Sequence, residues 1–109
     1  IPGMLSPKMF EQFARPYLAR IFNAFDGLIR VYHNDTPCMH LVESLAGLPF
    51  DVFNFSHEMN IADVQAKLPG KALMGNVSPF GLMVRGTPEQ VEAAARKCIH
   101  ETGGEGLVL

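Results

Sequence analysis

The sequence predicts an α/β fold in which parallel strands are joined by crossover helices. Short runs of β-branched and aromatic residues alternate with segments in which apolar residues recur at helical spacing. The connections between them are short, so successive strands must be parallel and joined by right-handed crossovers. Polar residues follow several of the strands, where their carboxyl ends meet at one edge of the sheet. Ligands bind at this edge in parallel α/β proteins, and we expect the functional site there.

Length and composition indicate a single folded unit of 109 residues with 48% hydrophobic and 18% charged residues. A formal net charge of −2 argues against nucleic acid as a partner, and no basic amphipathic segment indicates a membrane surface. Apolar runs are far shorter than the ~20 residues that cross a bilayer, and no signal peptide is evident, so we expect a cytoplasmic location. Cys38 and Cys98 show no CxxC spacing and are expected to be free, buried thiols.

The first third of the chain predicts one long helix, then a buried strand, then a short helix. Ser6 and Pro7 begin a helix that extends to about residue 25, and Pro16 should kink or break it near Phe13. The apolar run 28–33 predicts a buried strand that ends at His33. Thr36 is expected to cap a short helix whose first turn contains Pro37 and whose left-handed last residue is Gly47.

The same order of strand, polar cluster and helix repeats along the remaining chain. Strands are expected at 50–55, 72–77 and 107–109, helices after the caps Asn60 and Thr87, and a single helical turn within 80–86. This order suits both a doubly wound sheet and half of a (β/α)8 barrel. A barrel requires ~250 residues, so the second architecture places the other strands outside this chain. Because the chain begins with Ile1 and stops at a strand, we expect a fragment.

The polar residues at the strand ends are the candidate site. His33 and Asp35 are two residues apart on an extended strand end, so both should point the same way and could perform acid/base chemistry or share one divalent ion. The alternative is that such residues cap the next helix, as Asp35 could. The candidates for substrate binding at the same edge are Asn34, His57, Asn76 and Ser78.

Two further features of the sequence have the residue types of a functional site. Cys38 follows the polar cluster at a helix start, where the helix could lower the pKa of its thiol, but a half-buried inert thiol is the preferred interpretation. The glycine-rich segment 103–106 precedes a strand instead of opening a helix, and neither GxGxxG nor GxxxxGK[ST] occurs. Nucleotide binding is therefore not predicted.

The chain resembles the uroporphyrinogen decarboxylase superfamily of (β/α)8 barrels, which includes corrinoid-dependent methyltransferases. The resemblance lies in His33 with Thr36-Pro37, in 72–77 with Pro79, in 86–91 and in the close at 103–109. It covers essentially the whole chain and implies that residues 1–109 are a partial domain, about the C-terminal half of a TIM barrel. The N-terminal half and the final loop would lie outside it.

The resemblance implies two activities and leaves a third option open. As a decarboxylase, the protein would act on the acetate side chains of a uroporphyrinogen-type tetrapyrrole without a cofactor, and His33 or Asp35 would donate a proton or accept a pyrrole N–H. As a methyltransferase, it would use zinc and a corrinoid (cobalamin), with His33 and Asp35 as zinc ligands and a corrinoid protein as a partner. Asp35 stands where that branch typically carries a cysteine. The third option is an inactive structural or binding half-barrel, and exposed sheet edges also suggest a homo-oligomer.

Overall fold

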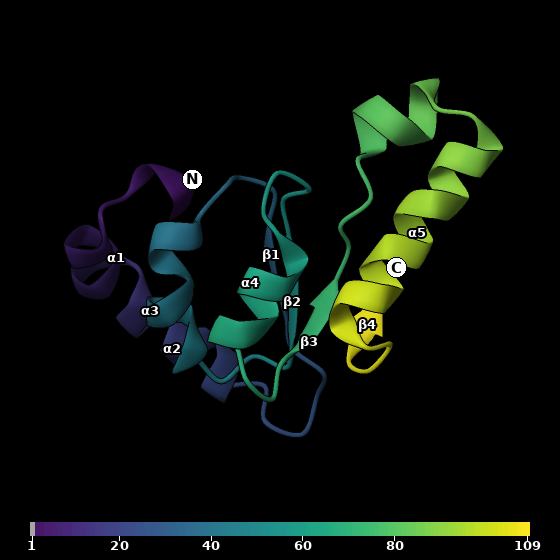
Figure 1. The fold of residues 1–109 in the computed structure, drawn as a ribbon. Helices are drawn as coiled ribbons and strands as arrows, with labels where there is room; N and C mark the ends of the chain where they lie inside the picture. Colours follow the sequence, from purple (N-terminus) through teal and green to yellow (C-terminus); the bar gives the residue numbers. More distant parts are fainter. Residues whose placement is uncertain (1) are drawn as a thin grey trace.

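The computed structural model describes residues 2–109, and in Figure 1 its four strands lie at the centre with helices around them. The strands are β1 (Val31–Asn34), β2 (Val52–Phe55), β3 (Ala72–Met74) and β4 (Leu107–Val108). The α-helices are α1 (Pro7–Phe13), α2 (Arg15–Asn23), α3 (Val42–Ala46), α4 (Ile61–Lys67) and α5 (Pro88–Thr102). Three shorter turns complete the chain: η1 (Pro2–Met4), η2 (Met39–Leu41) and the π-helical η3 (Pro79–Met83).

The four strands form one sheet in the order β1-β2-β3-β4, and every neighbouring pair is parallel. The predicted α/β class is therefore confirmed, and a parallel sheet whose strands follow chain order is consistent with part of a (β/α)8 barrel. In register, His33 lies beside Asn54 and Asn54 lies beside Met74. Residues at equivalent heights on three strands are thus brought together near the carboxyl ends.

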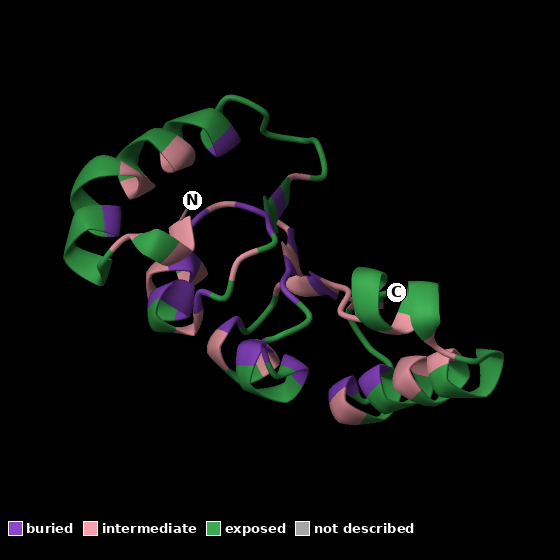
Figure 2. Cartoon of the chain, turned by 90° about the horizontal axis from the view of Figure 1, so that it is seen from above, coloured by how far each residue is buried: buried purple, intermediate pink, exposed green. Residues whose placement is uncertain are grey.

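The two faces of the sheet differ in their surroundings. The covered face packs against helix residues such as Leu45 of α3 and Val64 of α4, all in one buried cluster, and Figure 2 shows buried residues gathered on the strands and on the helix sides that face them. Alternation along the strands assigns residues to each face. The covered face carries Tyr32, Asn34, Phe53, Phe55 and Leu73, and the open face carries Val31, His33, Asn54 and Met74.

Stacked aromatic rings form the centre of the covered face. The ring centroids of Tyr32 and Phe53 are 5.8 Å apart, and those of Phe53 and Phe55 are 5.4 Å apart. Phe50 stacks on Tyr32, and Phe22 of α2 meets Tyr32 edge-on at 6.2 Å. Aromatic pairs at these separations stabilise a core beyond the area that they bury. The cluster therefore joins α2 to the first two strands.

The first strand is shorter than predicted. It begins at Val31 because β2 supplies partners only from Val52 onward, and the predicted burial of the run 28–33 is wrong at Leu28 and Ile29, which are 62% and 81% exposed. The strands expected at 50–55 and 72–77 are likewise trimmed to their paired residues. His33 lies within β1, which ends one residue later than predicted, at Asn34.

The long first helix divides where the proline predicted it. α1 ends at Phe13 and α2 begins at Arg15, with Pro16 in its first turn, where no amide is needed. The helical spacing of apolar residues in this segment does not by itself show which of them are buried. Phe10 and Phe22 enter the core, whereas Phe13, Tyr17 and Ile21 on the same helices, and Phe25 just after α2, are more than half exposed.

The predicted start of the third helix is wrong. Thr36 does not cap it, because its own N–H and hydroxyl donate to the side-chain oxygen of Asn34, and the helix begins only at Met39 with a 3-10 turn. Gly47 ends α3 with φ −84°, so it is not left-handed as expected. Its lack of a side chain instead leaves room for the guanidinium of Arg15.

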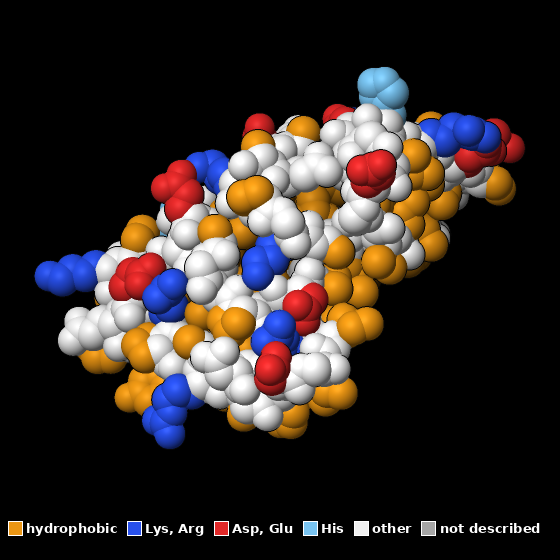
Figure 3. Space-filling view, turned by 90° about the horizontal axis from the view of Figure 1, so that it is seen from below, with side chains coloured by type: hydrophobic (Ala, Val, Ile, Leu, Met, Phe, Trp, Pro, Cys, Tyr) orange, Lys and Arg blue, Asp and Glu red, His pale blue; other side chains and the backbone are white. Residues whose placement is uncertain are grey.

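The later helix ends are as predicted. Asn60 accepts a hydrogen bond from the Asp63 amide, and Thr87 and Gln90 form a reciprocal capping box at α5. Gly103 ends α5 in the left-handed conformation. No helix within residues 2–109 is long and apolar enough to cross a bilayer. On the face seen in Figure 3, acidic and basic side chains are intermixed.

The buried hydroxyl of Tyr32 provides a test of the core. It is the one buried side-chain polar atom of the described residues without a hydrogen-bond partner, and burial raises the pKa of Tyr32 to about 12. Tyr32→Phe removes an unpaired polar group, so the free energy of unfolding in urea should stay equal or rise by up to about 1 kcal/mol. The exposed Tyr17→Phe should change it by less than about 0.5 kcal/mol. A clear loss of stability in Tyr32→Phe would contradict this packing.

An ion pair joins the amino ends of β1 and β2. Asp51 accepts from the backbone amide and the guanidinium of Arg30 at 2.8–3.1 Å, and these bonds lower the pKa of Asp51 to about 2. Lys71 holds the neighbouring backbone by donating to the carbonyls of Leu48 and Phe50. Charged groups thus secure the end of the sheet opposite the candidate site.

The Arg30–Asp51 pair predicts an acid-dependent contribution to stability. The pKa of Asp51 in the folded state lies below its unfolded value of about 4, so the contribution is complete above pH ~4 and declines as the pH falls toward 2. In urea unfolding, Asp51→Asn should therefore lose less stability than the wild type as the pH falls from about 4 to 2. Glu105→Gln, in an exposed turn, should follow the wild type. Parallel profiles for Asp51→Asn and wild type would contradict the pairing.

Candidate functional site

The site begins with His33 and Asp35 at the carboxyl end of β1. The strand period places both on the open face, as predicted, and Nε2 of His33 lies 3.2 Å from Oδ2 of Asp35. Their side chains are 65% and 78% exposed. An imidazole and a carboxyl group in contact and open to solvent can exchange a proton with a bound molecule.

Asn54 of β2 extends this pair across the sheet. Its side-chain oxygen is hydrogen bonded to Nδ1 of His33, and its amide nitrogen donates to the Met74 carbonyl at 2.9 Å. Both bonds follow from the strand register, which sets the three residues side by side. His33 is thus held at both ring nitrogens.

A pocket of about 330 Å³ opens beside this cluster at the carboxyl edge. Its polar lining includes three of the predicted residues, Asp35, His57 and Asn76, together with Asn54. Aromatic and aliphatic groups supply the apolar part, including Phe55, Val77, Pro79 and Phe80. A concave site with a few convergent polar groups and apolar walls is typical of small-molecule binding.

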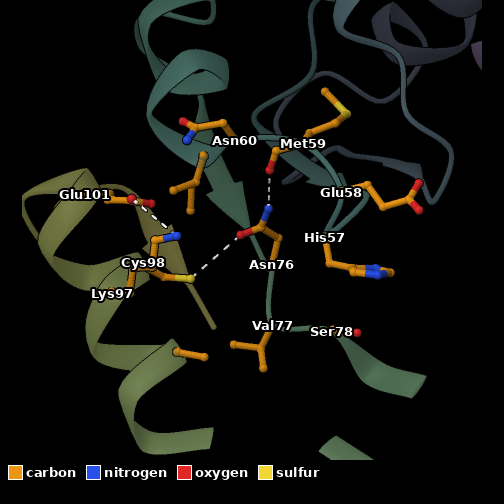
Figure 4. Close-up of a pocket in the computed structure, with 12 residues that line it drawn as sticks. His57, Glu58, Met59, Asn60, Asn76, Val77, Ser78, Lys97, Cys98 and Glu101 are labelled. Atoms are coloured by element: carbon orange, nitrogen blue, oxygen red, sulfur yellow. Dashed lines mark hydrogen bonds and ion pairs between the residues drawn. The ribbon is translucent and has the colours of Figure 1, made fainter. Parts of the chain in front are cut away.

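A second pocket of about 340 Å³ lies between the β2–α4 loop and α5. His57, Asn76 and Ser78 line it, so two of the predicted residues contribute to both pockets. Figure 4 shows Asn76 between the loop and the helix, where it donates to the Met59 carbonyl at 2.7 Å and faces the Cys98 thiol. Ser78 caps η3 through the Gly81 amide.

Asn34 lies on the covered face and lines neither pocket. It is 4% exposed, and its amide nitrogen donates to the Thr36 carbonyl and to Sγ of Cys38, each at 2.9 Å. These bonds, with those that its oxygen accepts from Thr36, hold the loop that follows β1. The structure therefore separates Asn34 from His33 and Asp35.

Cys38 is a free, buried thiol, as its lack of CxxC spacing predicted, and it is buried fully instead of half-buried as expected from its place at a helix start. It precedes η2 and faces the sulfur of Met59. Burial raises the pKa of its thiol, which is opposite to the lowering of the pKa that a helix start favours. Cys38 is a structural thiol.

Asn54 was missed by sequence reasoning. The available signal was a polar residue between Phe53 and Phe55, in a strand otherwise suited to burial. The sequence around Asn54 does not indicate its partner, because its hydrogen bond to His33 depends on the register between β1 and β2. His40 and His100 are both exposed and line neither pocket.

The described residues provide part of a metal site at most. The distance between His33 and Asp35 suits two ligands of one ion, but no third His, Cys, Asp or Glu of residues 2–109 joins them. Zinc sites in proteins use three or four protein ligands. The zinc predicted for the methyltransferase alternative does not fit this donor set.

Parallel strands in chain order, crossover helices and a polar pocket at the carboxyl edge are consistent with part of a (β/α)8 barrel. The model of the family Uroporphyrinogen decarboxylase (URO-D) matches residues 1–109. The chain belongs to this family.

Relatives named uroporphyrinogen decarboxylase support the match. The protein of Synechococcus sp. (strain CC9605) is 30% identical over 115 residues, which cover 98% of this chain and 31% of the relative. That of Desulfotalea psychrophila is 36% identical over 85 residues, or 75% of this chain and 24% of the relative. The chain thus spans about a third of the length of the curated relatives it matches.

Burial of Cys38 predicts slow chemical modification. In a Cys98→Ser variant, iodoacetamide should label Cys38 in the folded chain at least ~100-fold more slowly than in urea, because labelling requires opening of the core. The matched Cys38→Ser variant reports the same ratio for Cys98. Rapid labelling of folded Cys98→Ser near neutral pH would show an accessible thiolate and contradict the structural role.

Proposed function

We propose that the intact protein containing this chain decarboxylates acetate side chains of a uroporphyrinogen-type tetrapyrrole or a close relative of it. The observation that carries the proposal is the contact between His33 and Asp35 on the open face, in a chain of the uroporphyrinogen decarboxylase family. The pair lies at the carboxyl edge, beside a pocket with apolar walls. A proton donor next to an apolar surface suits a macrocycle of pyrroles with acidic side chains.

The chemistry needs one proton donor and no cofactor. His33 or Asp35 protonates a ring carbon of the pyrrole that bears the acetate group, which makes the ring an electron sink. The bond between the methylene carbon and the carboxylate then breaks, carbon dioxide leaves, and the electron pair moves into the ring. A proton from solvent then adds to the methylene carbon to give a methyl group, and the added ring proton returns to the His33–Asp35 pair, which restores the pyrrole.

Other residues of the edge bind and orient the substrate in this proposal. His57 is exposed and lines both pockets, so its imidazole can donate a hydrogen bond to a carboxylate side chain. Asn76 and Ser78 shape the same edge, while Asn34 holds the loop after β1. Phe80 supplies an exposed ring on which a pyrrole can pack.

Zinc-dependent methyl transfer to or from a corrinoid is the second candidate. The spacing of His33 and Asp35 would suit two ligands, but this activity requires at least one further donor beyond the described residues. The two candidates differ in their dependence on metal, and this difference can be measured.

Substitution of the pair tests the proposal. In the intact protein, His33→Ala and Asp35→Ala should each reduce the rate of carbon dioxide release from uroporphyrinogen by about 10²- to 10⁴-fold, because each removes part of the proton donor. His100→Ala, an exposed histidine on α5, should retain the wild-type rate.

Metal analysis separates the alternatives. Under the decarboxylase proposal, activity survives chelators and His33→Ala does not change the metal content. Wild-type rates in a His33→Ala, Asp35→Ala double variant would refute the assignment of the pair. Loss of about one zinc ion in His33→Ala, with turnover of a methyl-corrinoid by the wild type, would support the methyltransferase instead.

A further inference from the structure

Asn54 links His33 to the third strand and has no role in the chemistry proposed so far. It lies on the open face of β2, beside His33 in β1 and Met74 in β3. Its amide is part-buried and contacts both neighbours at once. A side chain with one acceptor and one donor group is thereby fixed between two strands.

The contact with Met74 determines which way the amide points. A backbone carbonyl only accepts hydrogen bonds, so the nitrogen of Asn54 must face the Met74 oxygen, 2.9 Å away. The side-chain oxygen of Asn54 then faces Nδ1 of His33 and can only accept. Nδ1 must therefore carry a proton.

This proton determines the state of the other ring nitrogen. In a neutral imidazole with a proton on Nδ1, the atom Nε2 has a free electron pair. Nε2 faces a carboxyl oxygen of Asp35 at 3.2 Å, and two unprotonated acceptors would repel each other at this distance. A second proton must lie between Nε2 and Asp35 for this contact to be a hydrogen bond.

We propose that Asn54 is a positioning residue that holds His33 with a proton on Nδ1, so that Nε2 shares a proton with Asp35 and is the atom from which it passes to substrate. This inference deepens the proposed decarboxylation, on which its substrate step rests. An amide needs both contacts for this role, because only one of its two ends accepts a hydrogen bond, whereas either oxygen of a carboxylate could accept from Nδ1. The contact with Met74 sets the orientation, and the contact with His33 transmits it.

The arrangement also accounts for the exposure of the pair. Nδ1 is turned toward the sheet and is occupied, whereas Nε2 and Asp35 are directed to the open side of the carboxyl edge. Asp35 and Asn54 both line the adjacent pocket. A substrate bound there would lie nearer to the proton shared by Nε2 and Asp35 than to the proton on Nδ1. Asn54 itself need not touch the reacting atoms.

The test uses nitrogen NMR of the intact protein, labelled with ¹⁵N at histidine. Long-range proton–nitrogen correlations distinguish protonated from unprotonated ring nitrogens, and His33→Gln assigns the signals. We expect a protonated Nδ1 in the wild type. In Asn54→Leu, which removes both contacts at similar volume, the preference for a protonated Nδ1 should be lost.

Two further variants separate positioning from general stability. Asn54→Asp retains an acceptor for Nδ1–H and should restore the Nδ1 signal that Asn54→Leu loses. Val64→Ala removes buried apolar packing from α4 on the covered face of the sheet, opposite His33, so it should lower stability and leave the His33 signals unchanged. In the decarboxylation assay, Asn54→Leu should lower kcat by about 10- to 100-fold with less than about threefold change in KM.

The outcomes distinguish this inference from the proposed function. An unprotonated Nδ1 in the wild type, or an unchanged Nδ1 signal in Asn54→Leu, overturns the role of Asn54 whatever the substrate. A protonated Nδ1 that depends on Asn54 supports the positioning role, even if uroporphyrinogen is not turned over and the proposed function fails. An Asn54→Leu enzyme with wild-type kcat overturns the catalytic consequence.

Discussion

The stacking of aromatic rings on the covered face is the constraint on which the rest of this structure depends. Tyr32 and Phe53 lie in register on neighbouring strands and pack ring against ring beneath α2 and its neighbours. Side chains alternate along a strand, so burial of these two residues directs His33 and Asn54 to the opposite face. A shift of one residue in β1 would turn the imidazole of His33 into the core, and a shift of one residue in β2 would do the same to the amide of Asn54. The packing of the core therefore determines where the chemical groups lie.

Amide side chains and ionisable side chains have different tasks at the carboxyl edge. Asn34 and Asn76 use their amides within the protein, to hold the loop after β1 and to join the β2–α4 loop to β3. His33, Asp35 and His57 remain exposed and available to a ligand. Neutral amides can satisfy buried backbone groups without burying a charge, which is costly. This explains why residues from one polar sequence cluster are found on both sides of the strand.

The two ends of the sheet are stabilised by different forces. At the amino end, Arg30 and Asp51 form an ion pair with several hydrogen bonds, and Lys71 donates to two backbone carbonyls while lying over the Phe50 ring. These contacts fix the starts of the strands. At the carboxyl end, the polar groups contact one another across strands but stay open to solvent. Rigid strand starts thus support a site whose groups can still reach a bound molecule.

The sequence by itself determined the class of fold, the break before Pro16, the caps at Asn60 and Thr87 and the pairing of His33 with Asp35. Each of these depends on local rules: hydrophobic periodicity, the missing amide of proline, side-chain capping and the two-residue period of a strand. These features can be predicted because the residues that determine each of them lie close together in the sequence.

Only the tertiary structure decided the features that depend on partners far apart in the chain. Exposure of Leu28 and Ile29 follows from where β2 begins, and burial of Cys38 follows from its contact with Met59. Phe13 and Tyr17 recur at helical spacing but stay exposed, because α1 and α2 turn Phe10 and Phe22 toward the core instead. Asn54 acquires its place at the site through strand register alone, because its partners, His33 and Met74, lie 21 and 20 residues away along the chain. Long-range packing selects such contacts, and no local pattern contains them.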